Sequence, residues 1–366
     1  MNGAEFTIGV EEEYQVVDPD SGALRGRAPE LLAEDGPIRE EYQRTMLEVS
    51  TPICTLAEEV RRRVAERRSF VQRLAAGKGL AVAAAGLHPV GPYPEEQLSE
   101  VESFHRTAAR GGAPWRMMHI FGMHVHVAVP DREAAVRAMA GATPFLPHLL
   151  VLSASSPFHL GRDTDFQSYR TVLRDMSPRV GPPLPVISIA EYDTLVRLLA
   201  GGPVRPGENS PLAWDVRPSE RYPTLEFRLF DVGPWLDTVA LLAAMARALT
   251  AMFADKPVGQ QTGTEMQLIR ENRWRAARFG LDANFLRLDP PTGEQRDARA
   301  SIRALGERLA PIAERLGDGD VLADLDRILA RGTAATAMRE VHQRTSSFPA
   351  VVRWVVEQTQ VGAAGG

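Results

Sequence analysis

The stretch that decides the fold is residues 6–17, FTIGVEEEYQVV, which is rich in β-branched and aromatic residues and therefore predicts a strand. Because successive side chains of a strand point to opposite faces, Glu11 and Glu13 share one face while Glu12 points to the other. Two like charges side by side on one face repel each other. The pair therefore predicts either an exposed edge strand or a Mg²⁺ site, since hard cations prefer carboxylate oxygens.

Residues 119–129, HIFGMHVHVAV, predict a second strand with a polar pair. His124 and His126 share one face, and the opposite face is apolar. Histidines in strands are often structural, and the alternative is that neutral imidazoles bind a metal or donate hydrogen bonds to a phosphate. Both interpretations stay open on the pattern alone.

A third strand is predicted for residues 224–232, TLEFRLFDV, where Glu226 and Arg228 share a face. The two side chains fit an ion pair, or a metal ligand beside a phosphate clamp. If the three strands are neighbours, their six polar groups form one floor suited to Mg²⁺ and a nucleoside triphosphate. Glu48, in the weaker strand candidate at residues 45–49, adds a carboxylate to that floor or is a solvated glutamate.

Helical periodicity separates the strands, which predicts an α+β fold rather than a regular alternation of strands and helices. Thr55, with Glu58 three residues later, predicts a capping box at the start of one helix. Asp131 predicts the N-cap of another. The helical segments are residues 55–76, 132–140, 190–199, 236–254, 265–279, 298–316 and 321–330.

The composition of the 366-residue chain, with 44% hydrophobic and 24% charged residues, is typical of a globular protein. A formal net charge of −5 and a single cysteine, Cys54, give no sign of a nucleic-acid partner, a membrane or an oxidising compartment, so we expect a cytoplasmic protein. No P-loop, dinucleotide fingerprint or zincin motif occurs. We expect one catalytic domain over residues 1–360, helical at about 298–358, and a disordered tail at 361–366.

Eight segments together resemble the glutamate–cysteine ligase type 2 family, whose members are often called YbdK-type carboxylate–amine ligases. They follow the family order from about residue 6 to residue 285 and read GVEEEYQVVDPDSG, LEVSTPIC, AAGLHP, GMHVHVAVPDREAAV, SPFHLGRDTDFQSYRT, AEYDTLV, WDVRPSERYPTLEFRLFDV and ENRWRAARFGLD. A match at so many separate places is specific for the family and much less specific for the substrate.

The resemblance implies a glutamine-synthetase-like catalytic fold, in which a curved, mainly antiparallel sheet is the floor of the active site and helices cover its other face. It implies ATP and Mg²⁺, activation of a carboxylate as an acyl phosphate, and attack by an amine to form an amide. In well-studied members the acid is glutamate, through its γ-carboxyl group, and the amine is cysteine. The family also suggests a homodimer.

Residue by residue, the resemblance implies a metal site, a nucleotide site and a substrate site. The metal ligands are Glu11, Glu13, Glu48, Glu226 and His124, and the catalytic residues are Glu11, Glu226 and Arg228, with Arg228 at the transferring phosphoryl group. The nucleotide residues are His124, His126, Arg228, Asn272 and Arg273, and the substrate residues are Arg162, Asp163, Tyr169, Arg170, Trp214, Asp215 and Arg217. For the substrate segments and for Asn272 and Arg273, a buried structural polar network is the alternative.

Departures from the family pattern concern the substrates rather than the phosphate chemistry. Leu47 stands where glutamine is common, Met123 where cysteine is and Ala128 where glycine is. His159 and the pair at residues 165–166 depart within the R-D-T segment. Three other functions stay open: a small-molecule kinase on the same fold, a catalytically inactive nucleotide- or amino-acid-binding protein, and a di-metal hydrolase that works without ATP.

Overall fold

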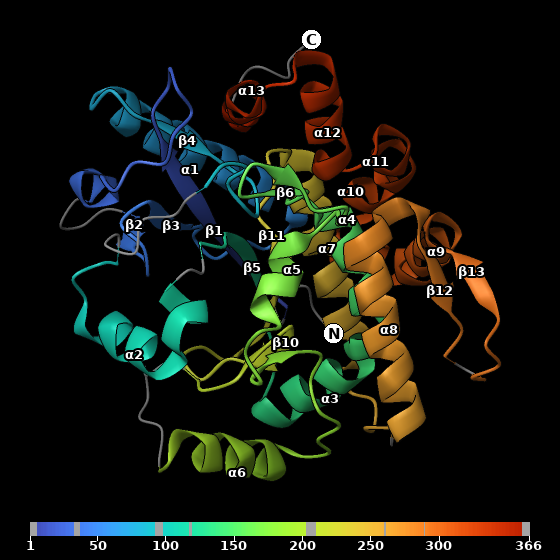
Figure 1. The fold of residues 1–366 in the computed structure, drawn as a ribbon. Coiled ribbons are helices and arrows are strands. Elements are labelled where there is room, and N and C mark those ends of the chain that lie inside the picture. The colour runs from blue at the N-terminus through green and yellow to red at the C-terminus, as the bar shows by residue number, and fades with distance from the viewer. Residues whose placement is uncertain are drawn as a thin grey trace.

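The chain forms an α+β fold around one large sheet, as the computed structural model in Figure 1 shows. The structure describes residues 6–32, 37–91, 98–116, 119–202, 210–259, 261–288 and 290–360. The tail predicted at 361–366 lies outside the described residues. Helices α2 and α6 lie at one end of the molecule, and α12 and α13 lie at the other (Figure 1).

Seven strands form the main sheet, in the spatial order β10-β11-β5-β1-β3-β2, with β4 paired to β1. They are β1 (Ile8–Val17), β2 (Ile38–Glu40), β3 (Met46–Ser50), β4 (Ala81–Ala83), β5 (Gly122–Ala128), β10 (Val216–Pro218) and β11 (Thr224–Asp231). All of their pairings are antiparallel. The three strands predicted to carry polar pairs, β1, β5 and β11, are therefore neighbours, as a shared floor requires.

The face of the sheet opposite the predicted floor is mostly apolar, with a buried Glu12–Arg68 ion pair, and is covered by helices. Val10 and Tyr14 of β1 and Val125 of β5 are at most 1% exposed there. Helices α1, α3, α4 and α7 pack against this face and against one another. Each buried aliphatic or aromatic side chain stabilises the fold by roughly 1.5–3 kcal/mol, so hydrophobic burial holds the sheet against its helices.

The helices mostly follow the predicted segments. They are α1 (Ala57–Ala76), α2 (Glu102–Arg116), α3 (Arg132–Ala142), α4 (Leu146–Ser153), α5 (Tyr169–Arg174), α6 (Ile189–Ala200), α7 (Leu236–Phe253), α8 (Gly263–Phe279), α9 (Ala298–Leu316), α10 (Gly319–Ala323), α11 (Leu325–Arg331), α12 (Ala334–Thr345) and α13 (Phe348–Thr359). Asp131 caps α3 as predicted, since its side chain accepts from the Ala134 N–H. The stretches 132–153 and 236–253 are long and apolar enough to cross a membrane, but 67% and 72% of the most apolar 18-residue window in each are buried, as in core helices.

Short elements complete the described chain. They are the two-stranded pairs β6 (Phe158–His159) with β7 (Arg162–Asp163), β8 (Val180–Gly181) with β9 (Ala213–Trp214), and β12 (Asn284–Leu286) with β13 (Gln295–Asp297), and the 3₁₀ turns η2 (Ala28–Leu31), η4 (Thr143–Phe145) and η5 (Gly280–Asp282). Helices α9 to α13 confirm a helical C-terminal part. That the whole chain acts as one catalytic domain stays a prediction.

The capping box predicted at the start of α1 is wrong. The residue before the helix, Leu56, makes no side-chain cap, and Thr55 binds Glu59 rather than Glu58. Asp318 supplies the cap instead: one of its carboxylate oxygens accepts from the Ala57 N–H at 2.8 Å. A pattern that reads only neighbouring residues cannot find a cap supplied by a segment distant in the sequence.

The single helix predicted at residues 321–330 is also wrong. Two short helices, α10 and α11, meet at Asp324. The Asp324 carboxylate pairs with Arg327 at 2.9 Å and with Arg61 of α1 at 3.6 Å. Because a short acidic side chain disfavours a helix interior and here has partners at the junction, the helix is interrupted at this point.

Candidate active site

The register of the main sheet brings the predicted acidic residues together on the face opposite the helices. Glu11 of β1 lies directly across from His124 of β5, and Glu13 lies across from Glu48 of β3. His124 Nδ1 is 3.3 Å from Glu11 Oε2, and His124 Nε2 is 3.8 Å from Glu13 Oε1. The histidine therefore stands between the two carboxylates of β1.

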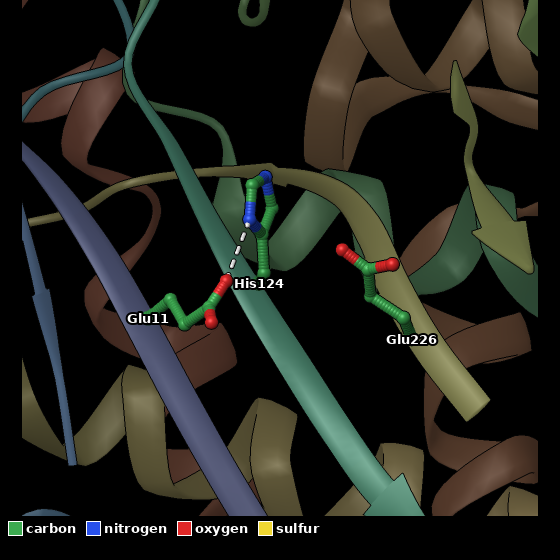
Figure 2. Close-up of side chains that lie close together, drawn as sticks. All are labelled: Glu11, His124 and Glu226. Carbon is green, nitrogen blue, oxygen red and sulfur yellow. Dashed lines mark hydrogen bonds and ion pairs between the residues drawn. The ribbon is translucent and has the colours of Figure 1, made fainter. Parts of the chain in front are cut away.

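Two groups of side chains have the composition and spacing of a metal site, and they share His124. Glu11, His124 and Glu226 each offer one ligand atom, and these atoms lie within 4.8 Å of one another; Glu13, Glu48 and His124 do the same. Figure 2 shows Glu11 and Glu226 on the strands either side of β5, with both carboxylates directed toward His124. A donor set dominated by carboxylate oxygens fits Mg²⁺ or Mn²⁺.

The electrostatics of the acidic half indicate excess negative charge. Burial, reinforced by the charges of Glu41, Glu11 and Glu13, raises the pKa of Glu48 well above its ordinary value. Burial and the charge of Glu13 raise the pKa of Glu41 to about 7. Burial also opposes ionisation of Glu11, but its interactions with His124 and with His126, whose Nε2 lies 3.6 Å from Glu11 Oε2, outweigh it and lower the Glu11 pKa. A divalent cation would neutralise this cluster.

The opposite half of the floor is cationic. Glu226 lies across from Arg217 of β10, and the two side chains pair at 2.8 Å. Arg228 pairs with the other oxygen of the same carboxylate. Although burial opposes ionisation, these two guanidinium groups lower the pKa of Glu226 well below its ordinary value. The arrangement places positive charge beside the metal-type ligands, where phosphate oxygens would lie.

Two nitrogen atoms on this half are buried without a hydrogen-bond partner among the described residues. They are Nε of Arg228 and Nε2 of His126. The other ring nitrogen of His126 contacts the Thr224 hydroxyl at 2.9 Å, which fixes the orientation of the ring. A buried polar atom left unsatisfied costs roughly 1–3 kcal/mol, so both atoms indicate that the floor is built to receive a polar ligand.

The first predicted substrate segment makes contacts both with α12 and with the floor. Asp163 pairs with Arg339 of α12 at 2.8 Å, and Arg162 is exposed on the same short strand, β7. The Tyr169 ring lies 5.8 Å from Phe166, centroid to centroid. Asp163 is thereby joined to α12, and the Arg170 guanidinium lies beside Glu13 at Gly122, on the face of the sheet that carries His124.

The second predicted substrate segment divides between the floor and a buried network. Arg217 is part of the floor, whereas Trp214 is 3% exposed and packs on Tyr192. Asp215 is fully buried and accepts from Arg174 at 3.3 Å and from Arg273 at 3.1 Å. Asp215 therefore neutralises buried arginines.

The structure gives the two residues predicted to bind nucleotide from α8 other partners. The Asn272 amide donates to the Leu286 carbonyl at 2.8 Å and accepts from the Leu286 N–H at 2.7 Å. Arg273 pairs with Asp175 at 2.6 Å in addition to Asp215. The contacts of both residues fit a buried structural polar network, which was the alternative to nucleotide binding.

The sequence pattern missed two residues near the floor. Glu41 lies before the turn that precedes β3, so the two-residue period that finds Glu48 does not extend to it. Arg174 is 5% exposed and donates to the backbone carbonyl of Arg228 at 3.2 Å. The sequence did hold one indication of Arg174: it lies four residues after Arg170 on a helix, so the two side chains share a face.

Comparisons with known proteins find one family over nearly the whole chain. A family model described as "Glutamate-cysteine ligase family 2(GCS2)" matches residues 7–356. The chain is 33% identical over 365 residues to "Putative glutamate--cysteine ligase 2" of Herpetosiphon aurantiacus, covering 98% of this chain and 94% of that one. It is 35% identical over 371 residues to a protein of the same name from a Roseiflexus species, covering 98% and 95%.

Two solved structures share the fold at low sequence identity. Glutamate–cysteine ligase of Francisella tularensis, determined in complex with AMP, superposes with a TM-score of 0.74 at 13% identity over 97% of this chain and 89% of that one. A bifunctional glutathione synthetase from Pasteurella multocida gives 0.73 at 15% identity over 99% and 53%. The predicted fold class is confirmed.

Family and relatives together define an ATP-dependent carboxylate–amine ligase. Within that class, the chain belongs to the glutamate–cysteine ligase family 2. The resemblance found in the sequence motifs is thereby confirmed over nearly the whole chain.

Proposed function

We propose that this ligase joins glutamate, through its γ-carboxyl group, to an amine, and that it forms an acyl phosphate on the way. The proposal rests on one observation about this face of the sheet. It carries two groups of side chains that could each hold a metal ion and, beside them, two arginines that both pair with Glu226. Transfer of a phosphoryl group between two anions requires this combination, because both reactants and the transition state carry negative charge.

Glu11, Glu13, Glu48, Glu226 and His124 would hold Mg²⁺, which screens the repulsion between the carboxylate and the triphosphate when it is bound. Glu41 is placed to add a further oxygen beside Glu48. Arg228 stabilises charge on the phosphoryl oxygens as they pass from ATP to the acid. His126 offers Nε2, which makes no hydrogen bond among the described residues, to the nucleotide phosphates.

The amine then attacks the carbonyl carbon of the acyl phosphate, and inorganic phosphate leaves with the oxygen that bridged the two groups. Positioning of the two substrates supplies much of the rate, since effective molarity is worth roughly 7–11 kcal/mol. Cysteine is the amine that the family name suggests. Action in the cytoplasm, as a homodimer without nucleic-acid or membrane partners, stays a prediction.

The test is the fate of carboxylate oxygen. Glutamate labelled with oxygen-18 in the γ-carboxyl group is incubated with ATP, Mg²⁺ and cysteine, and the phosphate is analysed by mass spectrometry. An acyl phosphate predicts one labelled oxygen in each phosphate released with amide. Amide formed with unlabelled phosphate would contradict the intermediate, and a phosphorylated acid without amide would favour a kinase.

A further inference from the structure

A bulge in β11 carries the arginine on which the proposed chemistry depends. The register against β5 shifts after Phe227, so two residues, Arg228 and Leu229, lie opposite the single residue His124. Bulges of this kind change the direction of side chains and recur beside active sites. The side chain of Arg228, at this bulge, donates to the Glu226 carboxylate.

The backbone of this bulge is held from outside the β11–β5 ladder. Arg174 donates to the Arg228 carbonyl at 3.2 Å, and Arg170 donates to the Leu229 carbonyl at 3.2 Å. The Arg228 N–H donates to the Asp215 carbonyl at 2.7 Å. Because Arg170 and Arg174 are four residues apart on α5, they share one face of that helix and reach successive carbonyls.

Two buried aspartates hold the supporting arginines. Asp215 accepts from Arg174 at 3.3 Å, and Asp231 lies 3.8 Å from Arg170. Both aspartates are at most 1% exposed. Asp231 also accepts from the hydroxyl of Ser168, at the start of α5, at 2.9 Å. Buried cations require such partners, so the geometry of α5 relative to β11 is fixed.

A glycine, Gly122, leaves the space that the Arg170 side chain occupies. A Cβ at Gly122, the first residue of β5, would lie 2.2 Å from Arg170 Nη2 and 3.3 Å from Glu13 Oε2. The Gly122 N–H also donates to Glu13. The guanidinium of Arg170 therefore occupies the space that a side chain at residue 122 would fill.

We propose that Arg170 and Arg174 are positioning residues that hold the Arg228 bulge and act on phosphoryl transfer through it. The inference rests on the role proposed for Arg228 and gives Arg170 a different part from the substrate contact that its motif suggests. Arg170 Nε has no hydrogen-bond partner among the described residues, so contact with the acid substrate is the competing role for that residue.

The test compares Arg174→Met and Arg174→Lys with a matched control, Arg247→Met. Arg247 is as deeply buried, pairs with Asp318 at 2.8 Å and donates to the Phe6 carbonyl at 2.7 Å, away from the floor. We expect the Arg174 variants to lose about 100-fold in kcat, the scale for a misplaced transition-state donor, with Mn²⁺ affinity within twofold of wild type. The control variant, while folded, keeps its kcat.

Amide hydrogen exchange measured by NMR supplies a readout that does not depend on turnover. Loss of the Arg174 hydrogen bond to the bulge is expected to raise the exchange rate of the Arg228 amide at least tenfold. The exchange rate of the Val125 amide, on the neighbouring strand, should not change. Retained kcat with retained protection in the folded Arg174→Lys protein would overturn the proposal. Equal losses of kcat in the Arg174 and Arg247 variants would also overturn it, because Arg174 would then contribute only to the stability of the fold.

Arg170→Lys separates the two roles of that residue. Faster exchange at the Arg228 amide with a lower kcat supports positioning. A raised KM for the acid with full amide protection would overturn positioning by Arg170 in favour of substrate contact. If the wild-type protein formed no amide with any substrate, the proposed function would fail, and the exchange measurements would still decide whether these arginines hold the bulge.

Discussion

The affinity of the floor for a divalent cation should depend on pH, with a midpoint set by Glu41. Burial and the charge of Glu13 raise the pKa of Glu41 to about 7 in the metal-free protein. A bound cation favours the ionised carboxylate and lowers that pKa, so binding must displace the proton wherever Glu41 is protonated. The apparent affinity therefore rises with pH below 7 and levels off above it.

The magnitude follows from one displaced proton. Glu41 is half protonated at pH 7 and almost fully protonated at pH 5. We therefore expect the divalent cation to bind about 50-fold more weakly at pH 5 than at pH 7, because each pH unit changes the free energy of a coupled proton by about 1.4 kcal/mol. About half a proton should be released per cation at pH 7. Glu48, whose pKa is also raised, steepens the dependence.

The assay uses Mn²⁺ as the probe, because its free concentration is read directly by electron paramagnetic resonance. Titrations at pH 5, 6, 7 and 8 give the affinity, and calorimetry in buffers of different ionisation enthalpy gives the released protons. Glu41→Gln is the matched variant and is expected to flatten the dependence. If the Mn²⁺ affinity of the wild-type protein did not change between pH 5 and 7, the carboxylate cluster would not be the cation site.

Three further predictions follow from single contacts. Glu11→Gln removes a ligand from the floor and should abolish Mg²⁺-dependent ADP release; turnover at the wild-type rate would refute the metal assignment. Asp318→Ala removes the α1 cap and the carboxylate partner of the buried Arg247, so the free energy of unfolding in urea should fall by about 3–5 kcal/mol; a loss below 1 kcal/mol would contradict this. Asn272→Ala should lower stability by roughly 1–3 kcal/mol and leave the KM for ATP unchanged; a raised KM in an equally stable protein would restore the nucleotide role.

The floor itself was predictable because strand alternation is a strong local rule. Glu11 and Glu13 must share a face of β1 whatever the tertiary structure is, and the same holds for His124 and His126. That these strands are neighbours was a hypothesis at that stage, and the register of β1 with β5 confirms it. Glu12, on the other face, pairs with buried Arg68 of α1 at 2.6 Å.

The contacts that refine the site join segments remote in the sequence, and local patterns do not show them. Asp215 and Arg273 were predicted to be ligand residues because they lie in motifs of the family, yet each is the partner of the other. The bulge at Arg228 depends on carbonyl contacts from α5, which no spacing within β11 reports. Motif residues that serve ligands and those that hold ligand residues in place have the same appearance in a sequence.

In the function proposed above, one sheet face activates a carboxylate with ATP for attack by an amine. The most direct measurement is ADP release with ATP, Mg²⁺ and glutamate across a panel of amines, with products identified by mass spectrometry. We predict a γ-glutamyl amide formed in equal amounts with ADP and phosphate for at least one amine, cysteine first. No ADP release with glutamate or any other carboxylic acid, whatever the amine, would contradict the claim.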